Sequence, residues 1–384
     1  MVYFDHNATT PLCAEAREAW LKASEEAWMN PSSPYPAASR VRHALDAARE
    51  ELAGHLDARP EEIVFTSGAT EAANLVLGHF ARQREQTLLI GATEHPCIRE
   101  SAQSGVAKVD ILPVQPQPDG RIAPLKLAER LRAKPRPALV AIMAANNETG
   151  TENDVEAIAR VCREAQVPFL CDAVQWIGKR PLGALRHADG LLGSAHKFGG
   201  PKGVGFARLG AALGDLRGAR GGQQEGGRRG GTENYPGIAA MVAALRSAQA
   251  TVEDAQAIAT REAWRSRFLE RVRGLGFGVA GSEAANLWNT VLLLPPLGER
   301  MRWVMRLAKR GFAVSTGSAC STGRESASAV LQALGIPDAT ARRAIRISSG
   351  RESSESDWQA LADAIECILA DLSAEDAPAT VVRI

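Results

Sequence analysis

Residues 63–84 read IVFTSGATEAANLVLGHFARQR, and this stretch is the clearest guide to the fold. Residues 63–66 form a short, apolar, largely β-branched run, which predicts a buried strand. Small residues follow, and the apolar positions after them recur with helical spacing. A strand that passes directly into a helix is typical of the crossover units that build parallel sheets.

The same alternation continues through residues 15–250. Apolar runs typical of strands occur at residues 88–92, 109–114, 138–145, 168–173, 190–195 and 203–209. The sequence therefore predicts an α/β large domain, residues 16–250, with a mainly parallel seven-stranded sheet covered on both faces. A glycine-rich stretch at residues 217–237 is expected to be a long loop. A helix at about residues 239–275 then leads into a smaller α+β domain, made of residues 1–15 and 251–384.

The composition is that of an ordinary globular protein. The chain has 384 residues, of which 45% are hydrophobic and 23% charged, and its formal net charge is +1. This balance predicts no attraction to nucleic acid or to a membrane surface. The apolar stretches are too short to span a bilayer, and MVYFDHNATTPLC does not resemble a signal peptide. We therefore expect a cytoplasmic protein.

The six cysteines form no C-x-x-C pair, which argues against a zinc knuckle or a redox motif. Five of them are expected to be small apolar filling residues. Cys320 differs because it lies among small and flexible residues in STGSACSTGRESASA, residues 315–329. Such surroundings suit an exposed, mobile thiol nucleophile. The alternative is a flexible surface loop with an incidental cysteine.

Two motifs supply an amine and an acid. Lys197 lies in GSAHKFGGPKG, residues 193–203, just after a predicted strand, as a Schiff-base lysine would. A surface lysine on a loop is the alternative. Asp172 opens DAVQ, residues 172–175, and is able to pair with a protonated pyridine nitrogen. The alternative is an aspartate that caps the following helix.

Two further motifs supply an anion site and an imidazole. TSGATEAAN, residues 66–74, begins a helix whose free N–H groups suit a phosphate, unless Ser67 or Thr70 merely caps it. His95 in TEHPC, residues 93–97, is placed to stack on a flat ring and to shuttle protons. The alternative is a loop histidine before a proline turn.

The asparagines of AANNETG, residues 144–150, follow another predicted strand. They are able to hydrogen-bond a ring oxygen and a substrate, although a polar turn is the simpler interpretation. Ligands of such sheets gather at the loops after the strands' carboxyl ends. We therefore expect these motifs to form one site.

Together, the motifs resemble those of one family. FTSGATEAAN, TEHP, NNETGT, DAVQ, SAHK, RRGGTEN and STGSACS occur in the order and approximate spacing of cysteine desulfurases of the NifS/IscS type, which are class V aminotransferases. YFDHNATTP at residues 3–11, NPSSPY at 30–35 and RISSGR at 346–351 also look like that family. The resemblance runs from residue 3 to about residue 370. It implies a type I pyridoxal-phosphate (PLP) transferase fold and a homodimer with the active site at the subunit interface.

The resemblance also implies residue roles. Lys197, His95 and Cys320 are the expected catalytic residues. The residues expected to bind PLP are Ala69, Thr70, His95, Asn147, Asp172, Gln175, Ser194, His196, Lys197 and, across the dimer, Thr232. Arg346 is expected to clamp the substrate carboxylate, with Asn147 beside it. Cys320 is also an expected ligand of a nascent iron–sulfur cluster.

The implied activity converts L-cysteine to L-alanine and moves the sulfur onto Cys320 as a persulfide. The sulfur would serve iron–sulfur cluster assembly or another thiolation, through an acceptor or scaffold protein. A selenocysteine lyase or another class V aminotransferase remains an alternative, as does a non-catalytic sulfur carrier. After Cys320 the chain reads STGRESASAV, where the family carries a leucine, a glutamate and a proline. This departure leaves the resting conformation of the loop open.

Overall fold

The computed structural model describes residues 1–214, 216–281, 285–317 and 328–375. Its main sheet has seven strands in the order β2-β8-β7-β6-β5-β3-β4. β8 is antiparallel to both of its neighbours, and the other pairs are parallel. The strands are β2 (Ile63–Thr66), β3 (Thr87–Gly91), β4 (Lys108–Leu112), β5 (Leu139–Met143), β6 (Phe169–Asp172), β7 (Gly190–Ser194) and β8 (Gly205–Leu209). Each predicted run coincides with one of them, so the predicted α/β fold with a mainly parallel sheet is confirmed.

The main sheet is buried on both faces, and successive residues of a strand point to opposite sides. In β5, Val140 and Ile142 pack into one core, whereas Leu139 and Ala141 pack into another. This is the period-two alternation of a strand, applied to a sequence that is apolar at every position. A continuous apolar run therefore marks a strand with helices on both sides.

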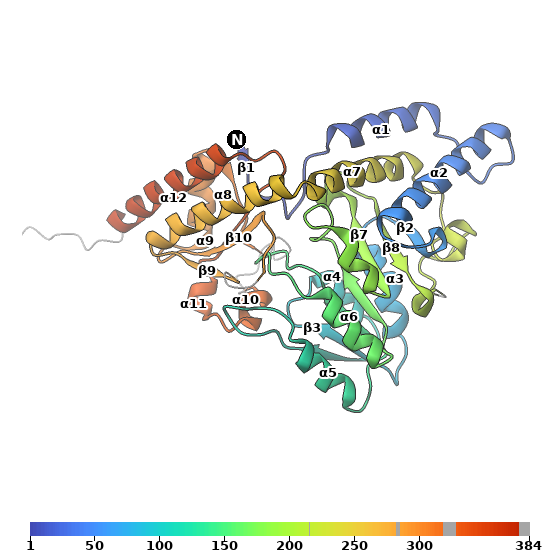
Figure 1. Ribbon diagram of the computed structural model, residues 1–384, viewed down its shortest axis with the longest axis horizontal. Helices are drawn as coiled ribbons and strands as arrows, with labels where there is room; N and C mark the ends of the chain where they lie inside the picture. Colours follow the sequence, from blue (N-terminus) through green and yellow to red (C-terminus); the bar gives the residue numbers. More distant parts are fainter. Residues whose placement is uncertain (215, 282–284, 318–327, 376–384) are drawn as a thin grey trace, which may run out of the picture.

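Helices cover the two faces (Figure 1). One face packs against α3 (Ala69–Ala81) and α4 (Pro96–Ala102). The other packs against α2 (Pro36–His55), α5 (Pro124–Arg132), α6 (Val155–Glu164) and α7 (Tyr235–Glu253). The remaining helix of this part is α1 (Ala14–Glu26).

A second core lies beside the first and joins the two ends of the chain. β9 (Gly278–Ala280), β10 (Thr290–Leu294) and β12 (Ile345–Ser348) form an antiparallel sheet, and β1 (Val2–Tyr3) pairs with β11 (Phe312–Ala313). Trp303 and Phe4, both fully buried, lie in this core. Its helices are α8 (Ala255–Gly274), α9 (Arg300–Lys309), α10 (Ala329–Ala333), α11 (Asp338–Ala341) and α12 (Glu355–Glu375). The domain boundaries at residues 15 and 250 remain a prediction.

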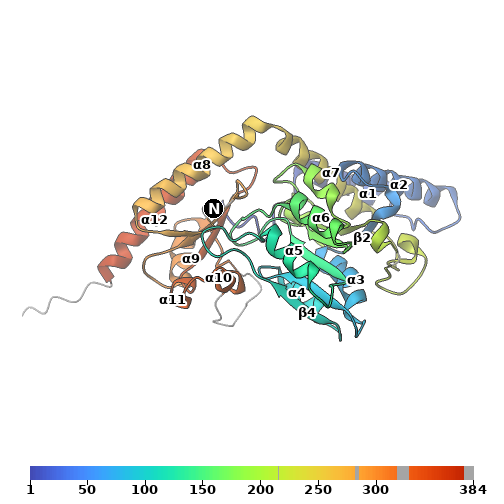
Figure 2. The ribbon, with the colours of Figure 1, turned by 60° about the horizontal axis from the view of Figure 1, so that its bottom comes forward.

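The expected single helix at about residues 239–275 is wrong. Two helices, α7 and α8, meet at Asp254, whose ψ of 91° leaves the helical region and whose side chain accepts a hydrogen bond from Ala257 N. Asp254 therefore caps α8 and breaks a helix that the apolar spacing alone would continue. Figure 2 shows α8 running away from α7 toward the second core. Of all the helices the structure describes, none has the length and apolar character to cross a membrane.

The glycine-rich stretch is held to the main sheet by one buried ion pair. Arg49 on α2 donates a bidentate pair of 2.8 Å hydrogen bonds to Glu225, whose side chain is only 1% exposed. Glu225 also accepts a 2.8 Å hydrogen bond from Phe65 N on β2. Arg49 lies over the Phe65 ring, 4.6 Å from its centroid, and donates to Ile63 O. These contacts connect the loop, β2 and α2.

We expect Glu225→Ala to lower the free energy of unfolding by about 3–5 kcal/mol, because it leaves Arg49 charged and unpaired at a buried position. The measurement is a urea unfolding curve for each protein. Arg246→Ala provides the control, since Arg246 pairs with Glu51 at the surface, where such pairs contribute about 1 kcal/mol or less. Equal midpoints for the two variants would contradict the role of the Arg49–Glu225 pair.

Candidate active site

The predicted site residues lie at one edge of the main sheet. Asp172 and Ser194 are the last residues of β6 and β7, and Lys197 follows in the short 3-10 turn Ala195–Lys197. His95 follows β3, and Asn147 follows β5. Because these parallel strands end at the same edge, residues far apart in sequence meet there.

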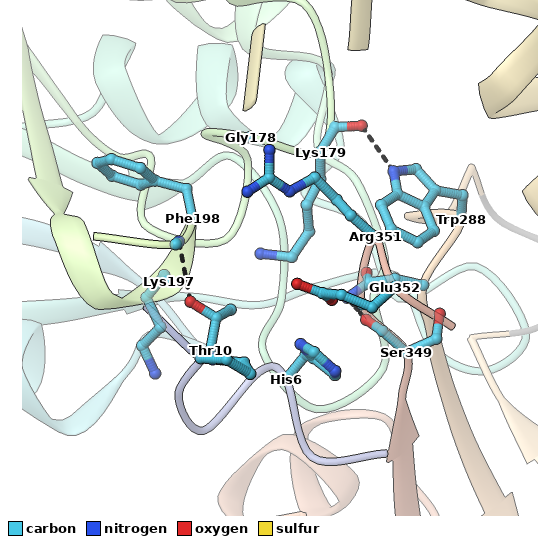
Figure 3. A pocket seen from close by; sticks show the side chains of 14 residues that line it. His6, Thr10, Gly178, Lys179, Lys197, Phe198, Trp288, Ser349, Arg351 and Glu352 are labelled. Carbon is cyan, nitrogen blue, oxygen red and sulfur yellow. Dashed lines mark hydrogen bonds between the residues drawn. The ribbon is translucent and has the colours of Figure 1, made fainter. Parts of the chain in front are cut away.

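Lys197 points toward the N-terminal segment. Its Nζ donates hydrogen bonds to the carbonyl oxygens of Asn7 and Ala8, at 2.6 and 2.8 Å. A cavity adjoins it, and His6, Lys179 and Glu352 line part of that cavity. Figure 3 shows Lys197 at one side of this space and Lys179 extending into it. Lys197 is therefore half-buried at the border of this cavity, with its amine held by the N-terminal segment.

Asp172 is a buried acid close to that amine. Its Oδ1 accepts a 3.0 Å hydrogen bond from Val174 N, as a capping aspartate would, but the following residues form a turn and not an α-helix. Burial raises the pKa of Asp172 to about 6, and the positive charge of Lys197 acts in the opposite direction. The carboxylate is therefore charged at neutral pH and becomes neutral under mildly acidic conditions.

His95 is a neutral imidazole. Burial, and then the charges of Lys197 and Arg99, lower its pKa to about 4. It is the N-cap residue of α4, and its Nδ1 accepts a hydrogen bond from Cys97 N at 3.2 Å. Since Nδ1 accepts, the proton of the neutral ring is on Nε2.

The N-terminus of α3 provides free backbone donors. Gly68 precedes the helix and has no side chain to cap it, so Ser67 and Thr70 do not act as the N-cap. A Cβ added at Gly68 would lie 3.5 Å from Ser194 Oγ, so the helix end and the end of β7 border the same space. Uncapped N–H groups beside a serine hydroxyl form an anion site.

Other predicted residues occupy distinct places. Thr70 and Thr232 are exposed, whereas Ala69 is buried at the start of α3. The Nδ1 atom of His196 lies 3.1 Å from Thr9 Oγ1. Burial, followed by the charges of Lys197 and Lys202, lowers the pKa of His196 to about 4.

Arg346 reaches the site from the second core. It is 2% exposed, and its Nη1 donates to Asn147 O and Gly317 O, each at 3.0 Å. Its Nη2 donates to Asp5 Oδ1 at 2.7 Å. Within the described ranges its Nε has no hydrogen-bond partner. Arg346 thus joins both cores and retains an unused donor.

The sequence motifs did not reveal the importance of Asn7. Its side chain, 1% exposed, donates to Asn147 O and Thr290 Oγ1 and accepts from Asn289 Nδ2. Its carbonyl oxygen accepts from Lys197 Nζ and also from Gln175 Nε2 at 3.1 Å. The only signal was the motif YFDHNATTP, which gave no role for this residue.

Two buried glutamates were also missed. Glu94 is fully buried, and burial, with the charge of Asp172 adding to it, raises its pKa well above the usual range. Its Oε1 accepts from Met143 N at 2.9 Å. Burial also raises the pKa of Glu148, which accepts a 2.6 Å hydrogen bond from Ser328 Oγ. Both acids lie in quoted motifs, but neither had a predicted role.

Cys320 lies outside the described residues, which end at Gly317 on one side and resume at Ser328 on the other. Its predicted roles as nucleophile and cluster ligand therefore remain predictions. In the part of the chain that the structure describes, no group of three or more His, Cys, Asp and Glu side chains is arranged to hold a metal ion.

The chain matches known proteins over nearly its whole length. The family model described as "Aminotransferase class-V" matches residues 2–361. A cysteine desulfurase of Frankia sp. is 37% identical, covering 95% of this chain and 90% of the relative. One from Gluconacetobacter diazotrophicus is 36% identical, covering 97% and 94%.

Solved structures agree with the sequence relatives. A structure titled "NIFS-LIKE PROTEIN" has a TM-score of 0.86 and 32% identity, covering 97% of this chain and 100% of its own. One titled "SspA in complex with cysteine" has a TM-score of 0.77 and 30% identity, covering 91% and 98%. Sequence motifs, fold and site geometry therefore point the same way: the chain belongs to the class-V aminotransferase family, among its NifS-like members.

Proposed function

We propose that this chain is a PLP-dependent cysteine desulfurase. The observation that carries the proposal is the grouping of half-buried Lys197, buried Asp172 and neutral His95 at one edge of the sheet, in a chain whose relatives are named cysteine desulfurases. The solved relative in complex with cysteine supports the same substrate. The reaction converts L-cysteine to L-alanine and supplies sulfur for iron–sulfur cluster assembly or another thiolation.

The described residues fit PLP part by part. A phosphate suits the uncapped N-terminus of α3 beside Ser194 Oγ. A buried carboxylate suits the pyridine nitrogen, and an enclosed amine suits the aldehyde. We assign the phosphate to Ala69, Thr70, Ser194 and His196, with Thr232 of a second subunit, and the ring to His95, Asn147, Asp172 and Gln175. When bound, PLP supplies an electron sink at the carbon that loses its proton.

Lys197 would hold the cofactor through its amine, and its Nζ would accept the substrate Cα proton. The carbonyl oxygens of Asn7 and Ala8 accept hydrogen bonds from Nζ and so stabilise the ammonium that results. His95 would pack against the cofactor ring and would offer the proton on Nε2 for transfer. Its low pKa keeps it neutral, so His95 itself adds no positive charge beside that ammonium.

Arg346 binds the substrate carboxylate, with Asn147 beside it. Its Nε, and one N–H of Nη2, have no hydrogen-bond partner within the described ranges. Two neighbouring guanidinium donors fit a carboxylate bidentately, which a lysine cannot do. This assignment makes Arg346 the residue that selects an α-amino acid.

Cys320 takes the sulfur. Its thiolate forms an S–S bond with the substrate sulfur while the substrate C–S bond breaks, and the carbon takes a proton to give alanine. Cysteine and a thiol thus become alanine and a persulfide, without an external oxidant or reductant. Arg346 and Glu148 hold Gly317 and Ser328, the described residues on either side of this segment. We propose that an acceptor or iron–sulfur scaffold protein in the cytoplasm then takes the sulfur.

We also propose a homodimer. Large apolar side chains are exposed on and around α1, which packs against α7 (Figure 1). They are Leu12, Trp20, Leu21, Trp28 and Tyr35, with exposures of 37% to 71%. Large exposed apolar side chains that gather on one face mark protein interfaces. A second copy would cover it and bring Thr232 to the neighbouring site.

The first prediction from this proposal concerns Cys320. With L-cysteine, the wild-type enzyme is expected to form alanine and sulfide in equal amounts when a thiol releases the persulfide. Cys320→Ser is expected to bind PLP and cysteine but to form neither protein-bound persulfide nor alanine. The measurement is a joint assay of alanine, sulfide and persulfide.

Cys367→Ser is the matched control, because Cys367 is an exposed thiol on α12 and is expected to be dispensable. Alanine formation that survives in Cys320→Ser would contradict the role of Cys320 and favour a lyase or an aminotransferase. Transfer of an amino group from L-alanine would favour the aminotransferase.

A second prediction concerns pH. The pKa of Asp172 is raised to about 6, so its charge is present above pH 6 and is lost as the pH falls through that value. We therefore expect the affinity of the apoenzyme for PLP to fall between pH 7 and pH 5. Asp172→Asn is expected to bind PLP about 10- to 100-fold more weakly at pH 7, the size of one charged hydrogen bond.

The PLP phosphate also titrates near pH 6, so the difference between wild type and Asp172→Asn isolates the carboxylate. Fluorescence titration of the apoenzyme at each pH measures both. Parallel pH curves for the two proteins would contradict the assignment.

A third prediction tests the dimer. Light scattering is expected to give twice the chain mass of 40.9 kDa, and Trp28→Glu is expected to shift the protein toward the monomer. Leu125→Glu is the control, since Leu125 is 79% exposed on α5, away from α1. A wild-type monomer at micromolar concentration would contradict the dimer.

A further inference from the structure

Lys179 is a buried cation that the proposed chemistry does not use. It is 4% exposed, and no carboxylate pairs with it among the residues that the structure describes. Its Nζ donates a 3.1 Å hydrogen bond to Gln175 Oε1, and its carbonyl oxygen accepts from Trp288 Nε1 at 3.0 Å. Burying an ammonium without an anion is costly, so its position calls for a physical explanation.

The two neighbours of the Gln175 side chain fix which way its amide faces. When Lys179 is an ammonium, its Nζ is only a donor, so the amide oxygen must face it, as in the structure. The carbonyl oxygen of Asn7 is only an acceptor, so the amide nitrogen must face it. Without Lys179, the Gln175 side chain would lose the hydrogen-bond donor that holds its amide oxygen in place.

The amide nitrogen then has a donor to spare. Gln175 Nε2 carries two N–H groups, and one donates to Asn7 O at 3.1 Å. The other has no partner in the described part of the chain. The same Asn7 oxygen also accepts from Lys197 Nζ, at 2.6 Å. The spare N–H therefore belongs to a side chain held directly beside the reactive amine.

We propose that Lys179 is a positioning residue that orients the Gln175 amide so that its free N–H serves the ring oxygen of PLP. This inference rests on the proposed binding of PLP and not on the use of cysteine as substrate. Lys179 itself does not contact the reacting atoms in this scheme; it acts through Gln175.

The electrostatics of Lys179 agree with a role beside an anionic cofactor. Burial, followed by the charges of Lys197 and Arg346, lowers the pKa of Lys179 to about 7. The charge of Lys179 in turn contributes to lowering the pKa of His196 and of His6. Glu352 faces His6 across the same cavity (Figure 3). Lys197 and Arg346 therefore repel the charge of Lys179, and no acid among the described residues lies within hydrogen-bond distance of it. An anion delivered by the cofactor would relieve this repulsion.

The test is a pH titration of the visible absorption of the PLP-loaded enzyme. An N–H donor at the ring oxygen and a nearby cation both favour the deprotonated chromophore. Lys179→Met, which is similar in shape but uncharged, removes both effects. We expect the midpoint of the titration to rise by about one pH unit, the size of one hydrogen bond.

Two further variants separate positioning from a general loss of charge. In a Gln175→Leu background, Lys179→Met is expected to give a clearly smaller rise, because the residue through which it acts is gone. Lys126→Met removes an exposed lysine on α5 and is expected to leave the midpoint unchanged. An equal rise in both backgrounds would show that Lys179 acts on the cofactor directly, which overturns the proposal.

Lys179→Gln keeps an N–H donor without a charge and is expected to give a smaller rise than Lys179→Met. If Lys179→Met does not fold, Lys179→Gln takes its place in the test. The titration midpoint of Lys179→Gln is then expected to rise by less than the midpoint of Gln175→Leu. An unchanged midpoint in Lys179→Met that retains PLP would sink the inference. If the wild-type protein develops no visible band with PLP, the proposed cofactor fails instead, so the two failures are distinguishable.

Discussion

The site depends on the position of Asn7 between the two cores. Its side chain forms hydrogen bonds with Asn147, Asn289 and Thr290. Its carbonyl oxygen accepts hydrogen bonds from Lys197 Nζ and Gln175 Nε2. A buried network of this kind is rigid only when every member is satisfied, because each unpaired polar group is costly in a medium of low dielectric. Lys197, the proposed Schiff-base lysine, is therefore held by the N-terminal segment as much as by its own strand.

The sheet and the location of the site were predictable from the sequence, because both depend on local signals. A buried parallel strand must be apolar on both faces, so a continuous apolar run such as residues 138–145 is recognisable as a strand from the sequence alone. Polar motifs directly after such strands must gather at one edge, which is why Asp172 and Lys197 were identified. The break at Asp254 was missed because the apolar spacing continues through it, and only the chain's change of direction makes a cap necessary.

The remaining parts of the site depend on contacts between distant residues, and no local pattern encodes them. Arg346 was expected to face a substrate, yet in this structure it also joins Asp5, Asn147 and Gly317. Lys179 looked like an ordinary lysine in DAVQWIGK until the fold placed it beside Gln175. In each case the sequence revealed the residue type, whereas the partner became visible only through tertiary packing.

The pairing of the N-terminus with the end of the chain has a consequence for biosynthesis. Asn7 N donates to Ser348 Oγ, and Arg346 donates to Asp5, each across 341 residues. At translation rates of about 5–20 residues per second, the first segment to leave the ribosome waits on the order of 20–70 s for these partners. During that time the main sheet is able to form, but Lys197 lacks its complete surroundings. The proposed catalytic centre of the nascent chain is therefore incomplete until β12 has emerged, and a product truncated before β12 would lack the contacts that join the N-terminal segment to the second core.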